Sequence, residues 1–392
     1  MLFSNTRIAE SFHDIRVAGH TLRTIAPAGS LTAAPGEEVV EGGWLTPPMA
    51  EPHVHLDAAL LGARMPNRSG TLREGIANWA VLRGMLTPED VRDRAIATAE
   101  MYAERGTLRI RTHVDTGSLM AVETLVALKA ELGDRGIDLE TVAFPQEGIL
   151  RAPGRRAQWE QAVALGVDCV GAIPHFERTT EEGWESVRLA FDLAERHGAK
   201  LDFHCDESDD PHSRNLEVVC AQAIDRDLAG RVVAGHCTAL HSYNHPYAEK
   251  VMELVATAGV QVIANPLDNV VLQGRYDRYP RRRGITRVDE LWRFGCTVGI
   301  GHDSVQDPWY RLGKAHMLDP AYMLVHVGQL TGERDMERVV ETLWTENHLP
   351  FGDVPVLAEG GPARMLWWPV QTATDLLIER PLPRVFRGRE VR

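Results

Sequence analysis

Short apolar runs rich in β-branched residues alternate with longer amphipathic segments from about residue 48 to residue 350. Eight of the runs have the length and composition of buried strands: residues 50–55, 108–114, 139–145, 167–173, 200–205, 231–236, 260–265 and 296–303. The amphipathic segments between them include residues 159–165, 185–197, 216–225 and 247–258. Strands that alternate with helices predict a parallel sheet, and eight such units predict a closed (β/α)₈ barrel of the TIM type.

The two ends of the chain follow a different pattern, in which short alternating segments are interrupted by Gly and Pro. These segments are residues 15–17, 22–25, 38–40, 365–368 and 385–387. We expect the ends to meet in a small β-sandwich beside the barrel. The predicted organisation therefore places residues 1–47 and 351–392 in the β-sandwich and residues 48–350 in the barrel.

Polar side chains stand at or just beyond the C-terminal end of nearly every predicted strand. They are His53 and His55, His113 and Asp115, Gln146, His175, His204 and Glu207, His236, Asn265, and Asp303. Barrel enzymes carry their catalytic groups at this face. An open doubly wound sheet would show the same alternation of strands and helices. The closed barrel is favoured because candidate ligands on the first, fifth, sixth and eighth strands converge only if the sheet closes.

A His-x-His pair, His53 and His55, lies in the first predicted strand. Side chains alternate along a strand, so both imidazoles project from the same face. Together with His204 and Asp303 they form a ligand set that suits a borderline divalent cation, Zn²⁺ or Fe²⁺. Such a cation activates water, and the pattern therefore predicts a hydrolytic enzyme.

The lysines argue for one metal ion rather than two. The chain has only four, Lys129, Lys200, Lys250 and Lys314, and none ends a predicted barrel strand. A bridging carboxylated lysine, which one common type of dinuclear centre needs, therefore has no candidate.

Two further residues leave alternatives open. Glu207 lies three residues after His204, where it can reach a substrate held over the metal and transfer a proton. It also belongs to an acidic run and could be a solvated loop carboxylate. His236 could be a metal ligand, a hydrogen-bond donor to the attacking hydroxide, or a core histidine, and its spacing does not distinguish these roles.

Composition narrows the choice of partners and compartment. The net charge of −13 argues against nucleic acid and anionic membrane surfaces as partners. No run of about 18 apolar residues is present, and the first 17 residues carry charges where a signal peptide needs an apolar core. The five cysteines are odd in number and lack CxxC spacing, which is typical of reduced thiols. We therefore expect a cytoplasmic protein that acts on a small molecule.

Several longer motifs resemble those of bacterial cytosine deaminases, which belong to the amidohydrolase superfamily. They are residues 51–57, 144–148, 171–177, 204–207, 264–267, 272–275, 282–287, 301–303 and 307–309. The resemblance extends over roughly residues 45–350. It implies a barrel with one Fe²⁺ or Zn²⁺ and a homo-oligomer in the cytoplasm. It assigns the metal ligands to His53, His55, His204 and Asp303.

The resemblance also implies roles for the residues around the metal. Glu207 matches the proton shuttle, His236 the residue that assists the hydroxide, Gln146 the amide that binds the pyrimidine, and Trp309 an aromatic wall. Chemistry agrees, because the Gln146 amide can both donate to and accept from a pyrimidine edge. Asp303 can take a proton from the attacking water, and Glu207 can protonate N3 as ammonia leaves. The cysteine signature of the other zinc-deaminase design is absent from the sequence.

One position departs from the family pattern. Cytosine deaminases of this kind usually have a second Asp after the metal Asp, and here the residue is Ser304. A smaller, uncharged side chain would enlarge the pocket at C5 of the pyrimidine, which favours 5-methylcytosine, with cytosine also a substrate. Neutral drift in a loop is the alternative explanation.

Other functions also fit the sequence. Isoguanine shares the pyrimidine edge of cytosine, and an amidohydrolase acting on an alkylaminotriazine or a cyclic amide would use the same ligand set. A non-catalytic binding protein is disfavoured by the intact ligands together with Glu207 and His236.

Overall fold

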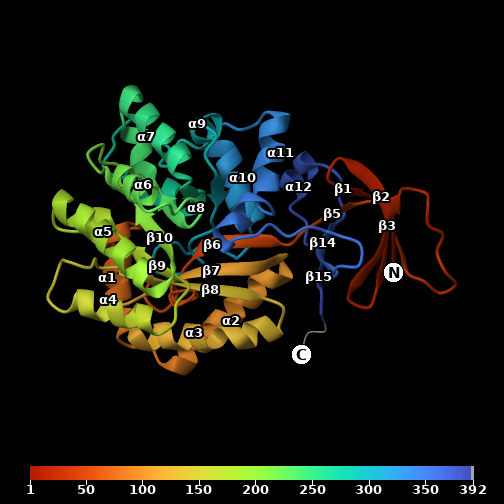
Figure 1. Ribbon diagram of the computed structural model, residues 1–392, viewed down its shortest axis with the longest axis horizontal. Helices are drawn as coiled ribbons and strands as arrows, with labels where there is room; N and C mark the ends of the chain where they lie inside the picture. Colours follow the sequence, from red (N-terminus) through yellow and green to blue (C-terminus); the bar gives the residue numbers. More distant parts are fainter. Residues whose placement is uncertain (390–392) are drawn as a thin grey trace.

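The computed structural model describes residues 1–389 and contains an eight-stranded parallel sheet whose strands follow one another in chain order (Figure 1). Its strands are β6 (Met49–Val54), β7 (Thr107–Asp115), β8 (Asp138–Phe144), β9 (Cys169–Ala172), β10 (Lys200–Cys205), β11 (Val232–His236), β12 (Gln261–Ala264) and β13 (Val298–Ile300). Each predicted strand overlaps one of them. A bridge between Val54 and Asp303 joins the last strand to the first. The barrel prediction is therefore confirmed, and the open doubly wound sheet is excluded.

Helices lie between the strands, and most of them cover the outside of the barrel (Figure 1). They are α1 (Leu72–Arg83), α2 (Pro88–Glu104), α3 (Leu119–Asp134), α4 (Arg155–Ala164), α5 (Thr180–His197), α6 (Asn215–Asp225), α7 (His245–Ala258), α8 (Pro266–Leu272), α9 (Val288–Arg293), α10 (Leu318–Val327), α11 (Glu333–Thr342) and α12 (Ala373–Glu379), with 3₁₀ turns η1 (Pro174–Phe176), η2 (Thr238–Ser242) and η3 (Glu346–Phe351). The four predicted helices correspond to α4–α7. Helix α5 begins five residues earlier than predicted because Thr179 caps it and Glu181 and Glu182 suit its positive N-terminus.

The two chain ends meet in a second sheet beside the barrel, which Figure 1 shows with N-terminal strands in red next to C-terminal strands in blue. Its seven strands are β1 (Leu2–Ile8), β2 (Ser11–Ala18), β3 (Thr21–Pro27), β4 (Val39–Glu41), β5 (Trp44–Thr46), β14 (Arg364–Trp368) and β15 (Arg384–Arg387). Phe3, Ile15, Leu22, Leu45 and Met365 are buried in its small core. The meeting of the ends was predicted, whereas β1 and β5 were not. The boundaries at residues 47 and 350 remain predictions.

The seam between β6 and β13 is also closed by a side chain. Asn347, which is fully buried, accepts a hydrogen bond from the Ile300 amide at 2.7 Å. Its amide group donates to the carbonyls of Ala50 and Ile300, both at 2.8 Å. Backbone bonds between β6 and Asp303 continue the seam toward the C-terminal face. First and last strands are thus fixed to each other by both main-chain and side-chain bonds.

Glu51 forms the next polar bridge along this seam. Its carboxyl accepts from the amide of His53 at 2.9 Å and from the amide of His302 at 3.1 Å. The Tyr102 hydroxyl donates a third hydrogen bond from helix α2. Because this carboxyl joins the backbones of residues 53 and 302, it fixes the strand that carries the His-x-His pair relative to the one that precedes Asp303.

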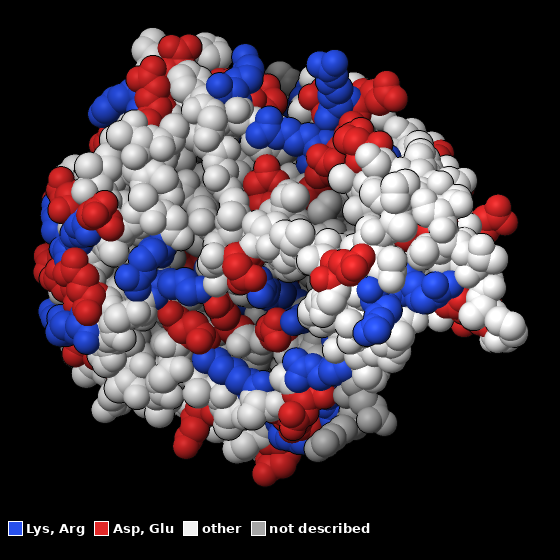
Figure 2. Space-filling view, turned by 45° about the vertical axis from the view of Figure 1, so that its right-hand side comes forward, with Lys and Arg blue, Asp and Glu red and all other residues white. Residues whose placement is uncertain are grey.

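The described part of the chain has no helix that is both long enough and apolar enough to span a membrane. On the face drawn in Figure 2, basic and acidic side chains are interspersed rather than gathered in patches of one sign.

Candidate active site

Side chains from the C-terminal ends of the barrel strands surround a small chamber. It is lined by His55, Leu72, Gln146, His204, Glu207, His236, Asp268, Leu272, Asp303, Ser304 and Trp309. Eight of the nine residues predicted for the site are among them, and the ninth, His53, is fully buried against His204, with ring centroids 4.6 Å apart. Leu72, Asp268 and Leu272 also line the chamber and were not predicted from the sequence. The barrel therefore gathers residues that are far apart in the chain around one cavity.

Four of these residues bring ligand atoms close together. The nearest nitrogens of His55 and His204 are 3.2 Å apart, and Asp303 Oδ1 lies 3.4 Å from His55 and 3.7 Å from His53. Neither ring nitrogen of His53 has a hydrogen-bond partner among the described residues. Buried imidazole nitrogens normally find a partner, and facing ring nitrogens need a proton or a cation between them. A divalent cation would satisfy both requirements, so the donor set fits a metal ion.

The charge state of the histidines also suits a cation. Burial, reinforced by the neighbouring imidazoles, holds the pKa values of His53 and His204 well below the usual range. Both rings are therefore neutral at pH 7, the form that binds metals. At His55, burial lowers the pKa, but the hydrogen bond and charge of Asp303 outweigh it and raise the value to about 8. The space between His55 and Asp303 thus favours positive charge.

A second group of possible ligands shares His53 and lies toward the floor of the barrel. His53, His113 and Asp202 have ligand atoms within 4.8 Å of one another. Asp202, however, already forms a buried ion pair with Arg111 at 2.9 Å. Its charge is therefore matched without a metal, and the ligand set around His55 and Asp303 is the better candidate.

Glu207 and His236 face each other across the chamber. Glu207 Oε1 lies 3.6 Å from His236 Nδ1. Burial, with a smaller contribution from Asp303, raises the pKa of Glu207 to about 8, so its carboxyl is protonated at neutral pH. A protonated carboxyl inside a cavity can donate a proton to a ligand. The solvated-loop alternative for Glu207 does not fit this burial.

His236 is oriented by two amides. Asn269 Nδ2 lies 3.1 Å and Asn265 Nδ2 lies 3.3 Å from its Nδ1, while its Nε2 lies 3.9 Å from Asp303 Oδ2. Because His236 lines the chamber, it is not simply a core residue. Its φ of +65° and the φ of +67° at Asp303 lie in the left-handed region that non-glycine residues rarely adopt. Such conformations are typical of functional sites whose surroundings impose them.

Trp309 forms an aromatic wall held from behind. Its ring centroid lies 5.6 Å from that of His55 and 5.8 Å from that of Trp79. Asp307 accepts from the Trp309 amide at 2.9 Å and fixes the loop. A Cβ on Gly75 would come within 2.6 Å of the Trp309 ring, so only glycine permits this approach. The wall thus depends on close packing between its loop and helix α1.

Asp268 is the functional candidate that sequence reasoning missed. It lies in the first turn of α8 and is 1% exposed. Ser304 Oγ donates to its Oδ2 at 2.5 Å. Burial, with contributions from Asp303 and Asp307, raises the pKa of Asp268 well above its usual range. An acidic residue in the first turn of a helix is ordinary in sequence, so no signal marked it.

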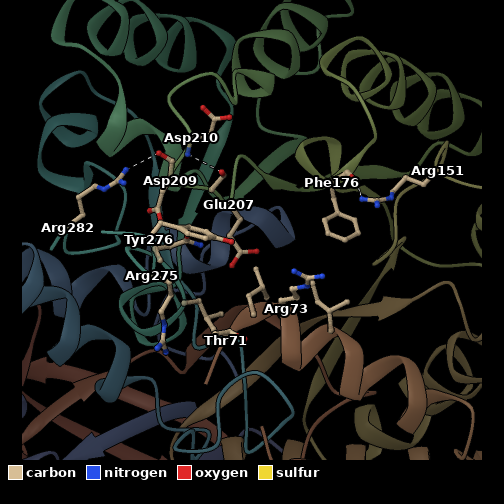
Figure 3. A pocket seen from close by; sticks show the side chains of 15 residues that line it. Thr71, Arg73, Arg151, Phe176, Glu207, Asp209, Asp210, Arg275, Tyr276 and Arg282 are labelled. Carbon is tan, nitrogen blue, oxygen red and sulfur yellow. Dashed lines mark hydrogen bonds between the residues drawn. The ribbon is translucent and has the colours of Figure 1, made fainter. Parts of the chain in front are cut away.

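A larger vestibule of about 850 Å³ lies outside the chamber (Figure 3). Leu72, Glu207 and Leu272 line both cavities, so the chamber and the vestibule adjoin at these side chains. Figure 3 shows arginine, aromatic and acidic side chains around this space, among them Arg151, which stacks over the Phe176 ring at 4.3 Å. The chamber itself has a volume of about 30 Å³ and is much smaller than the vestibule.

Comparisons with known proteins agree with this geometry. Residues 69–366 match the model of a family described as the amidohydrolase family. The structure of 5-methylcytosine deaminase from Klebsiella pneumoniae liganded with 5-fluorocytosine is 38% identical, with a TM-score of 0.92, covering 99% of this chain and 96% of that chain. N-isopropylammelide isopropylaminohydrolase from Burkholderia multivorans is 25% identical, with a TM-score of 0.83, covering 99% and 97%. A pterin deaminase of Rhizobium rhizogenes is 26% identical over 95% of this chain and 85% of that relative.

Proposed function

The chain belongs to the amidohydrolase family and is a hydrolytic deaminase of that superfamily, and on this premise we propose that its substrates are cytosine-type bases. 5-Methylcytosine, which would become thymine, is the favoured substrate, and cytosine, which would become uracil, is the second. The observation that carries the proposal is the chamber in which Gln146, Glu207, Ser304 and Trp309 surround the cation-fitting residues. The similarity to a 5-methylcytosine deaminase over 99% of the chain supports it.

The family is metal-dependent, and we assign one Fe²⁺ or Zn²⁺ to His53, His55, His204 and Asp303. The close approach of their ligand atoms and the unpartnered nitrogens of His53 support this assignment. When bound, the ion supplies Lewis acidity that makes water a nucleophile near neutral pH. The stacking of Phe144 on His204, with ring centroids 3.9 Å apart, fixes the orientation of that imidazole.

The remaining side chains would handle protons. Asp303 can accept a proton from the attacking water through the carboxylate oxygen that faces His236. His236, oriented by Asn269 and neutral because burial lowers its pKa to about 4, can hold the water by a hydrogen bond. Glu207 can donate its proton to N3 of the base, which allows ammonia to leave from C4. Each of these groups lines the same chamber, so no long-range transfer is needed.

Two residues would determine which base binds. The Gln146 amide can donate to the carbonyl of a pyrimidine and accept from its neighbouring N–H. Ser304 lies where related cytosine deaminases usually carry a second Asp, and its small side chain would leave room for a methyl group on C5. Burying one methyl is worth about 0.8 kcal/mol, so relief of a clash would have to supply the rest of the preference.

A second candidate function is favoured by the vestibule. Its volume of about 850 Å³ and its position beside the chamber would give a bicyclic base, such as isoguanine or a pterin, room to extend outward past Glu207. The pterin deaminase relative points the same way. An alkylaminotriazine is a third possibility, because of the similarity to N-isopropylammelide isopropylaminohydrolase. Monocyclic pyrimidines remain the first candidates because of the similarity to a 5-methylcytosine deaminase over 99% of the chain.

The test is turnover of a panel of bases, with metal analysis on the same sample. Ammonia release reports on the bases that carry a free amino group, whereas product formation is followed for N-isopropylammelide, which would release isopropylamine, and for a cyclic amide, which would open without releasing ammonia. The panel contains cytosine, 5-methylcytosine, isoguanine, pterin, N-isopropylammelide and a cyclic amide. We expect 5-methylcytosine to have the highest kcat/KM of this panel and cytosine to have the second highest. A higher kcat/KM for a bicyclic base, or no ammonia from either pyrimidine, would refute the proposal. The cytoplasmic location and the homo-oligomeric state remain predictions from the sequence.

A further inference from the structure

We propose that the niche beside C5 of the bound base is polar because of Asp268, and that the enzyme therefore deaminates cytosines that carry a hydrogen-bonding group at C5. The simplest such base is 5-hydroxymethylcytosine. Water would add to C4, the C4–N4 bond would break, and the products would be 5-hydroxymethyluracil and ammonia, with no change of oxidation state. This inference rests on the proposed function, since it places C5 beside Ser304.

The first support is an unsatisfied oxygen. Asp268 lines the chamber, and its Oδ2 accepts from Ser304. Its Oδ1 is buried and has no hydrogen-bond partner among residues 1–389. A buried polar atom without a partner is unfavourable. Because Oδ1 is itself buried, a small rotation of the Asp268 side chain would be needed to bring it to a polar group in the chamber.

The second support is the match between the niche and a hydroxyl. Ser304 uses its only hydrogen in the bond to Asp268, so its oxygen is left as an acceptor. Asp268 Oδ1 adds a second polar atom. A hydroxymethyl group, which can both donate and accept, matches this pair. A methyl group fits the space that Ser304 leaves but bonds to neither atom, so a hydroxymethyl group would add hydrogen bonds to the same fit.

The third support is that only one of the two nearby carboxyls faces the cavity. Asp307 is also fully buried near Ser304, but it does not line the chamber. Its Oδ1 accepts from the amides of Trp309 and Tyr310 at 2.9 and 3.0 Å and so serves the loop. Asp268 is therefore the carboxyl that a C5 substituent would meet.

The experiment compares kcat/KM for cytosine, 5-methylcytosine and 5-hydroxymethylcytosine within each variant, so that general losses cancel in the ratios. In the parent enzyme we expect 5-hydroxymethylcytosine to reach at least the value for 5-methylcytosine. Asp268→Leu, which keeps the approximate size but removes both oxygens, should lower the hydroxymethyl-to-methyl ratio at least tenfold. Asp268→Asn, which keeps hydrogen-bonding atoms, should preserve the ratio within a few-fold.

Asp307→Asn is the matched control, because it neutralises a neighbouring carboxyl outside the chamber. Because Asp307 also lies near Ser304 and fixes the Trp309 loop, the individual rates will fall, whereas the hydroxymethyl-to-methyl ratio should change far less than in Asp268→Leu. If the parent enzyme turns over cytosine and 5-methylcytosine but its kcat/KM for 5-hydroxymethylcytosine is tenfold lower than for 5-methylcytosine, this inference is overturned while the proposed function stands. A ratio that Asp268→Leu leaves unchanged would overturn the role of Asp268. If none of the three bases is turned over, the proposed function fails first.

Discussion

Replacing Glu207 by Gln tests the proton transfer most directly. Gln keeps the shape of the side chain but has no proton to transfer. With a pKa of about 8, the Glu207 carboxyl is about nine-tenths protonated at pH 7, whereas a glutamate of ordinary pKa would be protonated in about 0.3% of molecules. General acid–base groups contribute about 10²–10⁴-fold, or roughly 2.7–5.5 kcal/mol of transition-state stabilisation. We therefore expect Glu207→Gln to lose turnover by that factor while keeping its metal.

Steady-state ammonia release from cytosine and 5-methylcytosine measures the loss, and elemental analysis of the same samples shows whether the metal is retained. Glu249→Gln, which makes the same change on the exposed face of α7, is the matched control and should stay within a few-fold of the parent. Because the active form of Glu207 is the protonated one, parent kcat/KM should fall as pH rises, with a midpoint no higher than about 8. A bound cation moves that midpoint downward without reversing the direction. Activity of Glu207→Gln within a few-fold of the parent would refute the assignment.

Three further predictions concern the metal, the C5 niche and the barrel seam. Active enzyme should contain one equivalent of metal, and a chelator should remove both the metal and the activity. His204→Ala should not retain the metal, and two equivalents in active enzyme would contradict the mononuclear site. Ser304→Asp should lower kcat/KM for 5-methylcytosine relative to cytosine by a factor equivalent to about 1–3 kcal/mol, because a second carboxyl would meet Asp268 and crowd the methyl group. If the ratio of the two kcat/KM values does not change, Ser304 does not determine the preference at C5. Asn347→Leu should lower the free energy of unfolding, measured by urea denaturation, by at least about 3 kcal/mol, because it removes three hydrogen bonds of the seam. A loss below about 1 kcal/mol would mean that the seam does not depend on these hydrogen bonds.

The barrel could be predicted from the sequence because each of its strands is a local apolar run. The His-x-His pair is equally local, since alternation along one strand is enough to place both rings on one face. Strand β1 escaped prediction because its partners are β2, β4 and β5, and its own sequence mixes polar and apolar residues without a clear period.

The parts of the site that escaped prediction depend on contacts between distant residues. Asp268 becomes a site residue only because Ser304, 36 positions later, places its hydroxyl on the carboxyl. The role of His236 stayed open because Asn265, just after β12, and Asn269, in α8, determine its orientation. No spacing rule in a single sequence contains that information.

The closed seam places candidate metal ligands on both sides of the last junction of the barrel. His53 and Asp303 are 250 positions apart in the chain yet adjacent in the structure. At about 5–20 residues per second, a ribosome would need roughly 12–50 s to synthesise the intervening segment. During that time His53 in β6 and His55 just after it exist without their carboxylate partner and without β13. Capture of the metal by the full ligand set is therefore an event that follows synthesis of the barrel, and a chain truncated before β13 would have nothing to complete the site.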